Sequence, residues 1–101
     1  MKARLIKAQR QEVGREEDEA FIEISVWQVP SPVRGSAHRF KYRLALVVHR
    51  VCVMRYDNEA GKGDHKHVDE SEFPYEFVNL GKLQRDFGLD ARRWLARHAR
   101  H

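Results

Sequence analysis

The sequence predicts an α+β domain, in which an antiparallel meander of about four strands carries a C-terminal helix packed on one face. Three observations predict it. Residues 38–49 alternate between apolar and basic side chains, strand-like stretches lie before and after them, and residues 80–95 hold apolar side chains at spacings of three and four. A chain of 101 residues can build only one hydrophobic core, so residues 1–101 are predicted to form a single domain.

The first two strands are expected at "KARLIKAQRQ" (residues 2–11) and "AFIEISVWQV" (residues 20–29). In the second of them, alternate apolar residues point to one face and polar residues to the other. An acidic turn, "VGREEDE", is expected between these strands. The stretch "PSPVRGS" after them is predicted to be a loop, because its prolines cannot donate to a strand ladder.

The clearest alternation lies in "HRFKYRLALVVH". One face of this third strand is apolar and is expected to pack in the core: Phe40, Tyr42, Leu44, Leu46 and Val48. The other face carries a basic stripe of Arg39, Lys41 and Arg43.

The fourth strand, "RVCVMRYDN", is predicted to pair with the third through a hairpin that turns at residues 49–50. This register sets Val48 opposite Val51 and Arg43 opposite Tyr56. Tyr56 would then share a face with the basic stripe.

A C-terminal helix is predicted over "LGKLQRDFGLDARRWLARH", with Asn79 as its N-cap. Its apolar stripe is typical of core packing and consists of Leu80, Leu83, Phe87, Ala91, Trp94 and Leu95. Before it, "EFPYEFV" is expected to be a short extended piece, since Pro74 restricts the conformation of Phe73.

Composition narrows the class of protein. No apolar run approaches the roughly 20 residues of a membrane-spanning helix, and no signal-peptide core is present, so a cytoplasmic protein is predicted. The single Cys52 cannot form an internal disulfide and is expected to lie in the core. The net charge of +4 is concentrated toward the arginine-rich C-terminus, which favours a polyanionic partner or a solvated tail.

The stretch "RYDNEAGKGDHKH" (residues 55–67) is interpreted as a loop that handles phosphate. Gly61 and Gly63 flank Lys62, so the backbone can approach a ligand beside an ammonium group. A plain glycine turn explains the pattern equally well. The spacing is not that of a Walker motif.

His65 and His67 are two residues apart, so in an extended segment their rings lie on the same side. They suit an acid–base pair without metal or other cofactor, with Lys62 or Arg55 stabilising the phosphate. They equally suit two metal ligands, completed by a nearby acid: Asp57, Glu59 or Asp64. Exposed polar loop residues are the simplest alternative. The acid–base pair is favoured, because Lys62 beside the histidines would repel a cation.

The segments "FKYRLALV", "VMRYDNEAGKGDHKH", "PYEF" and "LQRDFGLDARR" together resemble the TumE family of small bacterial toxins, over about residues 26–93. The residues that match its central motif are Arg55, Tyr56, Asp57, Asn58, Glu59, Gly61, Lys62, Gly63, Asp64, His65 and His67. The resemblance implies the toxin of a type II toxin–antitoxin pair, with a helix-turn-helix antitoxin as partner. "GKGDH" is also similar to the histidine-bearing turn of HicA-type ribonuclease toxins.

The leading hypothesis is therefore a toxin that attacks RNA as an endoribonuclease, with His65 and His67 as acid and base. Asp57 or Asp64 would orient a histidine, and Tyr56 would stack on a base. Phosphate would be held by Lys62, Arg55, Gly61, Gly63 and the basic stripe. A non-catalytic nucleic-acid-binding module and a metal-dependent hydrolase or nuclease are the alternatives, and a second copy of the chain is left open as a partner.

Overall fold

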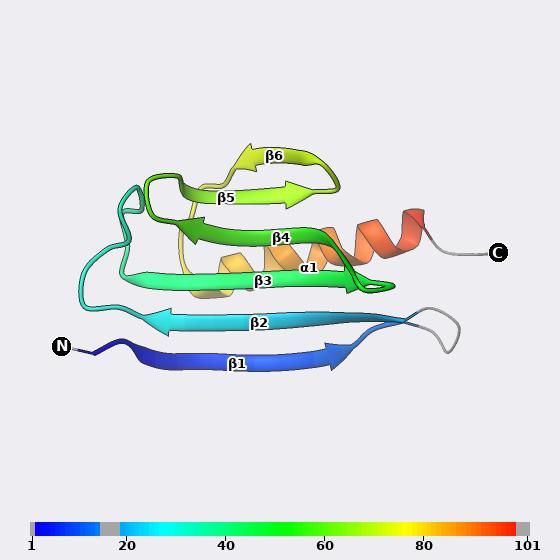
Figure 1. The fold of residues 1–101 in the computed structure, drawn as a ribbon, viewed down its shortest axis with the longest axis horizontal. Helices are drawn as coiled ribbons and strands as arrows, with labels where there is room; N and C mark the ends of the chain where they lie inside the picture. The colour runs from blue at the N-terminus through cyan, green and yellow to red at the C-terminus, as the bar shows by residue number, and fades with distance from the viewer. Residues whose placement is uncertain (1, 15–18, 99–101) are drawn as a thin grey trace.

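The structure is a computed structural model that describes residues 2–14 and 19–98. Within these residues, six strands form one antiparallel sheet in which each strand pairs with the next along the chain. The elements are β1 (Arg4–Glu12), β2 (Ala20–Gln28), β3 (Phe40–Val48), β4 (Val51–Glu59), β5 (Gly63–Val68), β6 (Ser71–Pro74) and α1 (Leu80–Arg97). Figure 1 shows this meander, with the helix behind the sheet. The α+β meander is confirmed, but it has six strands instead of about four.

The two additional strands come from the segments interpreted as a loop and as a short extended piece. "RYDNEAGKGDHKH" continues β4, turns at residues 60–62 and returns as β5. Positive φ angles at Gly61 (88°) and Gly63 (76°) permit this reversal, because glycine has no Cβ to clash there. A two-residue turn at residues 69–70 then leads into β6. The glycines therefore make a hairpin rather than a long loop.

One face of the sheet packs against α1. The buried apolar side chains of the helix are Leu83, Phe87, Ala91 and Trp94, and they meet apolar side chains of β2, β3 and β4. This confirms the predicted stripe, and burying each large member contributes about 2 kcal/mol. The helix begins as predicted at Asn79, whose side chain accepts a hydrogen bond from the backbone N–H of Lys82 (2.8 Å).

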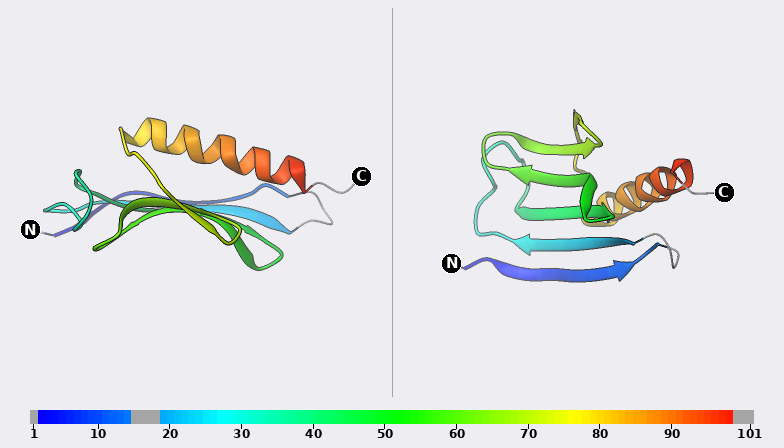
Figure 2. Two further views of the ribbon diagram at one scale, coloured as in Figure 1. Left: turned by 90° about the horizontal axis from the view of Figure 1, so that it is seen from above. Right: turned by 45° about the vertical axis from the view of Figure 1, so that its right-hand side comes forward.

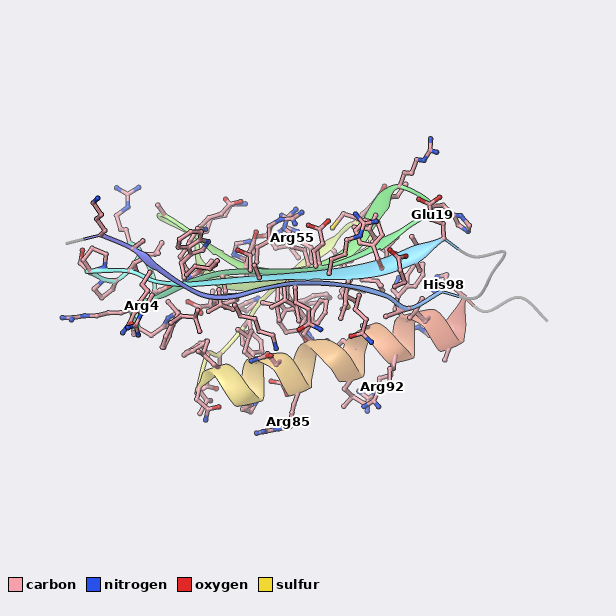
Figure 3. The ribbon with its side chains drawn as sticks, turned by 90° about the horizontal axis from the view of Figure 1, so that it is seen from below. Arg4, Glu19, Arg55, Arg85, Arg92 and His98 are labelled. Carbon is pink, nitrogen blue, oxygen red and sulfur yellow. The ribbon has the colours of Figure 1, made fainter. Side chains whose placement is uncertain are left out.

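The face of the sheet turned away from α1 is called the open face below, because no helix of the described residues covers it. Figure 2 shows α1 on one side of the sheet only. In Figure 3, Arg55 projects to the open face, while Arg85 and Arg92 project from the outer side of the helix.

The β3–β4 hairpin turns where the sequence predicts, and Val48 pairs with Val51. Both residues of the turn, His49 and Arg50, have positive φ angles (49° and 68°), as a two-residue primed turn requires. The register then shifts by one residue between Val47 and Leu46. A β-bulge of this kind leaves one extra residue in β4.

The observed pairing corrects two expectations. Arg43 lies opposite Asp57, and Leu44 lies opposite Tyr56, so Tyr56 does not share a face with the basic stripe. Cys52 is exposed instead of buried, since it pairs with Val47, which points away from the core. The first error follows from the bulge, which the predicted register did not include. The second follows from assigning an apolar stretch to the core without assigning its face.

The loop expected at residues 30–36 is confirmed, as residues 29–39 contain no strand or helix. The expected acidic turn falls partly on residues 15–18 and the end of the basic tail on residues 99–101, which lie outside the described residues. Among the residues described, no helix is both long and apolar enough to cross a membrane.

Candidate active site

Strand pairing gathers polar side chains from β4, β5 and β6 on the open face. Arg55 lies opposite His67, and Asp57 lies opposite His65. On the other side of β5, His67 pairs with Glu72 of β6. Paired residues share a face of the sheet, and so do alternate residues along each strand. Five polar residues that are spread over 18 positions of the chain therefore meet in one place.

Asp57, His65 and His67 form the centre of this site and are called the histidine cluster below. Oδ1 of Asp57 lies 2.7 Å from Nε2 of His65, and both side chains are more than nine-tenths buried (8% and 4% exposed). The His65 and His67 rings are in edge-to-face contact, with centroids 4.9 Å apart. His67 is the more accessible of the two, with 24% of its side chain exposed. The predicted proximity of the two rings is confirmed.

The environment of His65 fixes its orientation. Nδ1 of His65 lies 3.0 Å from the carbonyl oxygen of Gly63, which can only accept a hydrogen bond, so Nδ1 carries a proton. On the other side of the cluster, Nε of Arg55 lies 2.9 Å from Oδ2 of Asp57. This is an ion pair and not an aligned hydrogen bond, because Arg55 Nε is left without a hydrogen-bond partner. Asp57 is thus held between a guanidinium and an imidazole.

Glu72 lies at the rim of the cluster and was missed in the sequence. Its Oε1 is 3.9 Å from Nε2 of both His65 and His67, and 3.6 Å from Nζ of Lys62. The short spacing between His67 and Glu72 is the signal that could have revealed Glu72. It is typical of a tight hairpin, and the two residues pair across β5 and β6. Lys62, whose side chain is 55% exposed, is therefore the cationic edge of the site, as expected.

Asp64 belongs to a different cluster. Its two oxygens accept from the hydroxyls of Ser36 and Tyr42, and its Oδ2 lies 2.6 Å from Nε2 of His38. Burial, with the hydrogen bond to Asp64, raises the pKa of Tyr42 far above its ordinary value, so its hydroxyl donates at any physiological pH. Asp64 joins the loop of residues 29–39 to β5, and none of these contacts involves His65 or His67. Alternation along β5 turns it to the face opposite His65.

Tyr56 is not accessible for base stacking. It is 1% exposed, lies under α1, and its hydroxyl donates to the Asp90 carboxylate. Burial and this hydrogen bond raise the pKa of Tyr56 far above its ordinary value. The prediction that Tyr56 meets a base is wrong, and the physical reason is the bulge that turns it to the helix face.

The glycines serve packing between two loops instead of forming a phosphate cradle. The backbone N–H of Gly61 donates to the carbonyl of Arg34 (2.7 Å), and that of Lys62 donates to the carbonyl of Glu59 (3.0 Å). These amides already have partners within the protein. Gly63 is buried beside Gly35.

The basic stripe reaches the open face only in part. Arg43 is exposed there, opposite Asp57. Lys41 is half-buried, and its Nζ donates to the backbone carbonyl of Asn58. Arg39 is exposed and precedes β3. Arg43 is therefore the member of the stripe best placed to meet a ligand of the histidine cluster.

The cluster holds a group of potential metal ligands. Among the described residues, one oxygen of Asp57 and one ring nitrogen each of His65 and His67 lie within 4.8 Å of one another. Of the three acids considered for this role in the sequence, Asp57 belongs to the group, whereas Glu59, which is exposed, and Asp64 lie outside it.

Comparison with known proteins adds a family. The family model described as Toxin TumE matches residues 2–95 of the chain. No curated protein and no solved structure matches the chain. The matched residues include all six strands of the sheet, the helix up to Leu95 and every member of the histidine cluster. The chain therefore belongs to the TumE family, the toxins of toxin–antitoxin pairs, and an antitoxin is its partner.

Proposed function

We propose that this toxin acts on RNA and cleaves phosphodiester bonds at the histidine cluster. One observation carries the proposal: two imidazoles in ring contact lie beside a buried carboxylate, with cationic side chains next to them on an uncovered sheet face. Cleavage of a phosphodiester needs groups that move protons or polarise the phosphate, and cations that hold it. Lys62 and Arg43 are exposed at the cluster's edge and would hold the phosphates of the substrate.

The acid–base pair predicted from the sequence is one route to this reaction. His67, the more exposed ring, would face the substrate. His65 is more deeply buried and would act beside His67, with Asp57 as its orienting partner. The same ring nitrogens could instead bind a metal, which is the second route predicted from the sequence. These two routes use the same lone pairs, so only one of them can operate.

Growth arrest and RNA cleavage test the proposal together. The toxin is expressed from an inducible promoter without its antitoxin, and the purified protein is incubated with labelled single-stranded RNA and with DNA of the same sequence. The wild type is expected to stop growth and to cut RNA, whereas His67→Ala does neither. His98→Ala is the matched control, because His98 is an exposed histidine that stacks on Trp94 at the end of α1.

Each variant is first shown to be folded by its thermal unfolding curve. A folded His67→Ala protein that still stops growth and still cuts RNA would contradict the proposal. RNA binding without cleavage by the wild type would instead support the non-catalytic nucleic-acid-binding module. The cytoplasmic location and the helix-turn-helix type of the antitoxin stay predictions.

A further inference from the structure

His65 presents a conflict between two acceptors. Its Nδ1 proton is committed to the carbonyl of Gly63, so the neutral ring has only a lone pair on Nε2. That lone pair faces Oδ1 of Asp57, a second acceptor, at 2.7 Å. Both atoms are buried, and neither has a hydrogen-bond partner, so the contact is not aligned as a hydrogen bond. Something that accepts lone pairs would resolve the conflict.

The conflict extends to His67. Its Nε2 is also buried without a hydrogen-bond partner, so three unpartnered atoms converge within 4.8 Å, from Asp57, His65 and His67. Buried polar atoms in proteins are nearly always paired, and each unpaired one lowers the stability of the fold. A proton on Nε2 of His65 would pair His65 with Asp57 but would leave Nε2 of His67 without a partner. A single cation would accept a lone pair from each of the three atoms.

We propose that Asp57, His65 and His67 bind one divalent transition-metal ion, of the zinc or manganese class. Two imidazoles and one carboxylate, with a further position open, are the donor set of catalytic zinc sites and of related first-row metal sites. Glu72, at 3.9 Å from both Nε2 atoms, is the nearest group for the open position. Tetrahedral metal–ligand bonds of about 2.0–2.2 Å hold the ligand atoms about 3.3–3.6 Å apart. Oδ1 of Asp57 and Nε2 of His65, now 2.7 Å apart, would therefore separate slightly, while ligand atoms up to 4.8 Å apart would draw closer.

The groups around the three ligands fit such a site. A metal-binding histidine usually donates its other ring N–H to a carbonyl or carboxylate, and the carbonyl of Gly63 takes this part for His65. Arg55 pairs with Oδ2 of Asp57 and leaves Oδ1 for the ion. The repulsion expected from Lys62 is reduced, because Lys62 lies 3.6 Å from the Glu72 carboxylate.

Binding of the ion does not depend on the proposed function, whereas its role in cleavage rests on it. A divalent ion supplies charge to a phosphate oxygen or lowers the pKa of a bound water, either of which promotes phosphodiester cleavage. Binding and cleavage are therefore measured separately.

Binding is tested on tag-free protein that has been dialysed against chelator. Zn²⁺ and Mn²⁺ are titrated in a calorimeter, and Co²⁺ is titrated by visible absorption. The wild type is expected to take up one ion per chain and to unfold at a higher temperature with it. Asp57→Asn and His67→Ala are expected to lose at least tenfold in affinity, and His98→Ala none. His67 is the safest substitution for folding, because it is the least buried of the three ligands.

A folded wild type that binds none of these ions stoichiometrically would overturn the metal site, and so would affinity unchanged in both ligand variants. For the role in cleavage, chelator should abolish RNA cutting and Zn²⁺ or Mn²⁺ should restore it. RNA cutting by protein shown to be free of metal would overturn that role while leaving the proposed function intact.

Discussion

Gly35 and Gly63 pack backbone against backbone, so closely that a Cβ added to Gly63 would lie 2.6 Å from the carbonyl oxygen of Gly35. This contact ties the loop of residues 29–39 to the β4–β5 turn. Lys62 and the carbonyl that accepts from His65 both lie at that turn. The position of the histidine cluster therefore depends on two residues without side chains.

Gly63→Ala is expected to destabilise the protein by about 2 kcal/mol, because alanine adds a backbone clash and is strained at a positive φ of 76°. The measurement is the free energy of unfolding in urea. Gly88→Ala in α1 is the matched control, since nothing lies within 4 Å of its added Cβ. It should stabilise by about 1 kcal/mol through helix propensity. Equal effects of the two substitutions would disprove the packing argument.

Asp64→Ala is expected to lower the free energy of unfolding by about 3 kcal/mol, because its partners Ser36, His38 and Tyr42 would lose their shared acceptor. Asp64→Asn keeps one oxygen acceptor and should cost less. RNA cleavage per folded molecule is expected to stay near the wild-type value in Asp64→Asn, since Asp64 does not contact the histidine cluster. A folded Asp64→Asn protein without cleavage activity would restore Asp64 as a catalytic candidate.

The stability contributed by Asp86 is expected to disappear in acid. Hydrogen bonds from Lys82 and then Tyr75 hold the pKa of Asp86 below its ordinary 3.8. A lowered folded-state pKa means that the contribution is complete above about pH 4 and is lost as the pH falls through the folded value. Because the carboxylate is 31% exposed, the effect should stay below about 1 kcal/mol.

The measurement for Asp86 is the difference in unfolding free energy between the wild type and Asp86→Asn, at pH 7 and at pH 2.5. This difference should shrink in acid. Glu70→Gln, at the exposed β5–β6 turn, is the control and should show little difference at either pH. A difference for Asp86→Asn that grows in acid would mean that the sign of the pKa shift is wrong.

Arg43→Glu is expected to weaken binding of single-stranded RNA several-fold and to lower the slope of log Kd against log salt concentration by about 1, as for the loss of one phosphate contact. Arg92→Glu changes the net charge equally but lies on the outer side of α1 (Figure 3), and it should leave the affinity close to that of the wild type. Equal weakening by both substitutions would mean that RNA responds to net charge and not to the open face.

Part of the candidate site could be predicted from the sequence because it depends on local spacing. His65 and His67 lie two residues apart, and the extended backbone alone places their rings on one side. Glu72 could not be found in this way, since it reaches the cluster only through the β5–β6 pairing. Asp64 was assigned to the histidines by its place in the chain, and strand alternation sends it to the opposite face.

The sequence by itself determined the features that local patterns control: strands β1 to β4, the core face of β3, the hairpin turn at residues 49–50, and the helix from its cap at Asn79. Only the tertiary structure decided which polar residues meet. A bulge shifts β4 by one residue, and a shift of one residue in a strand exchanges its two faces. Asp57 thereby meets His65 on the open face, while Tyr56 is buried beneath the helix.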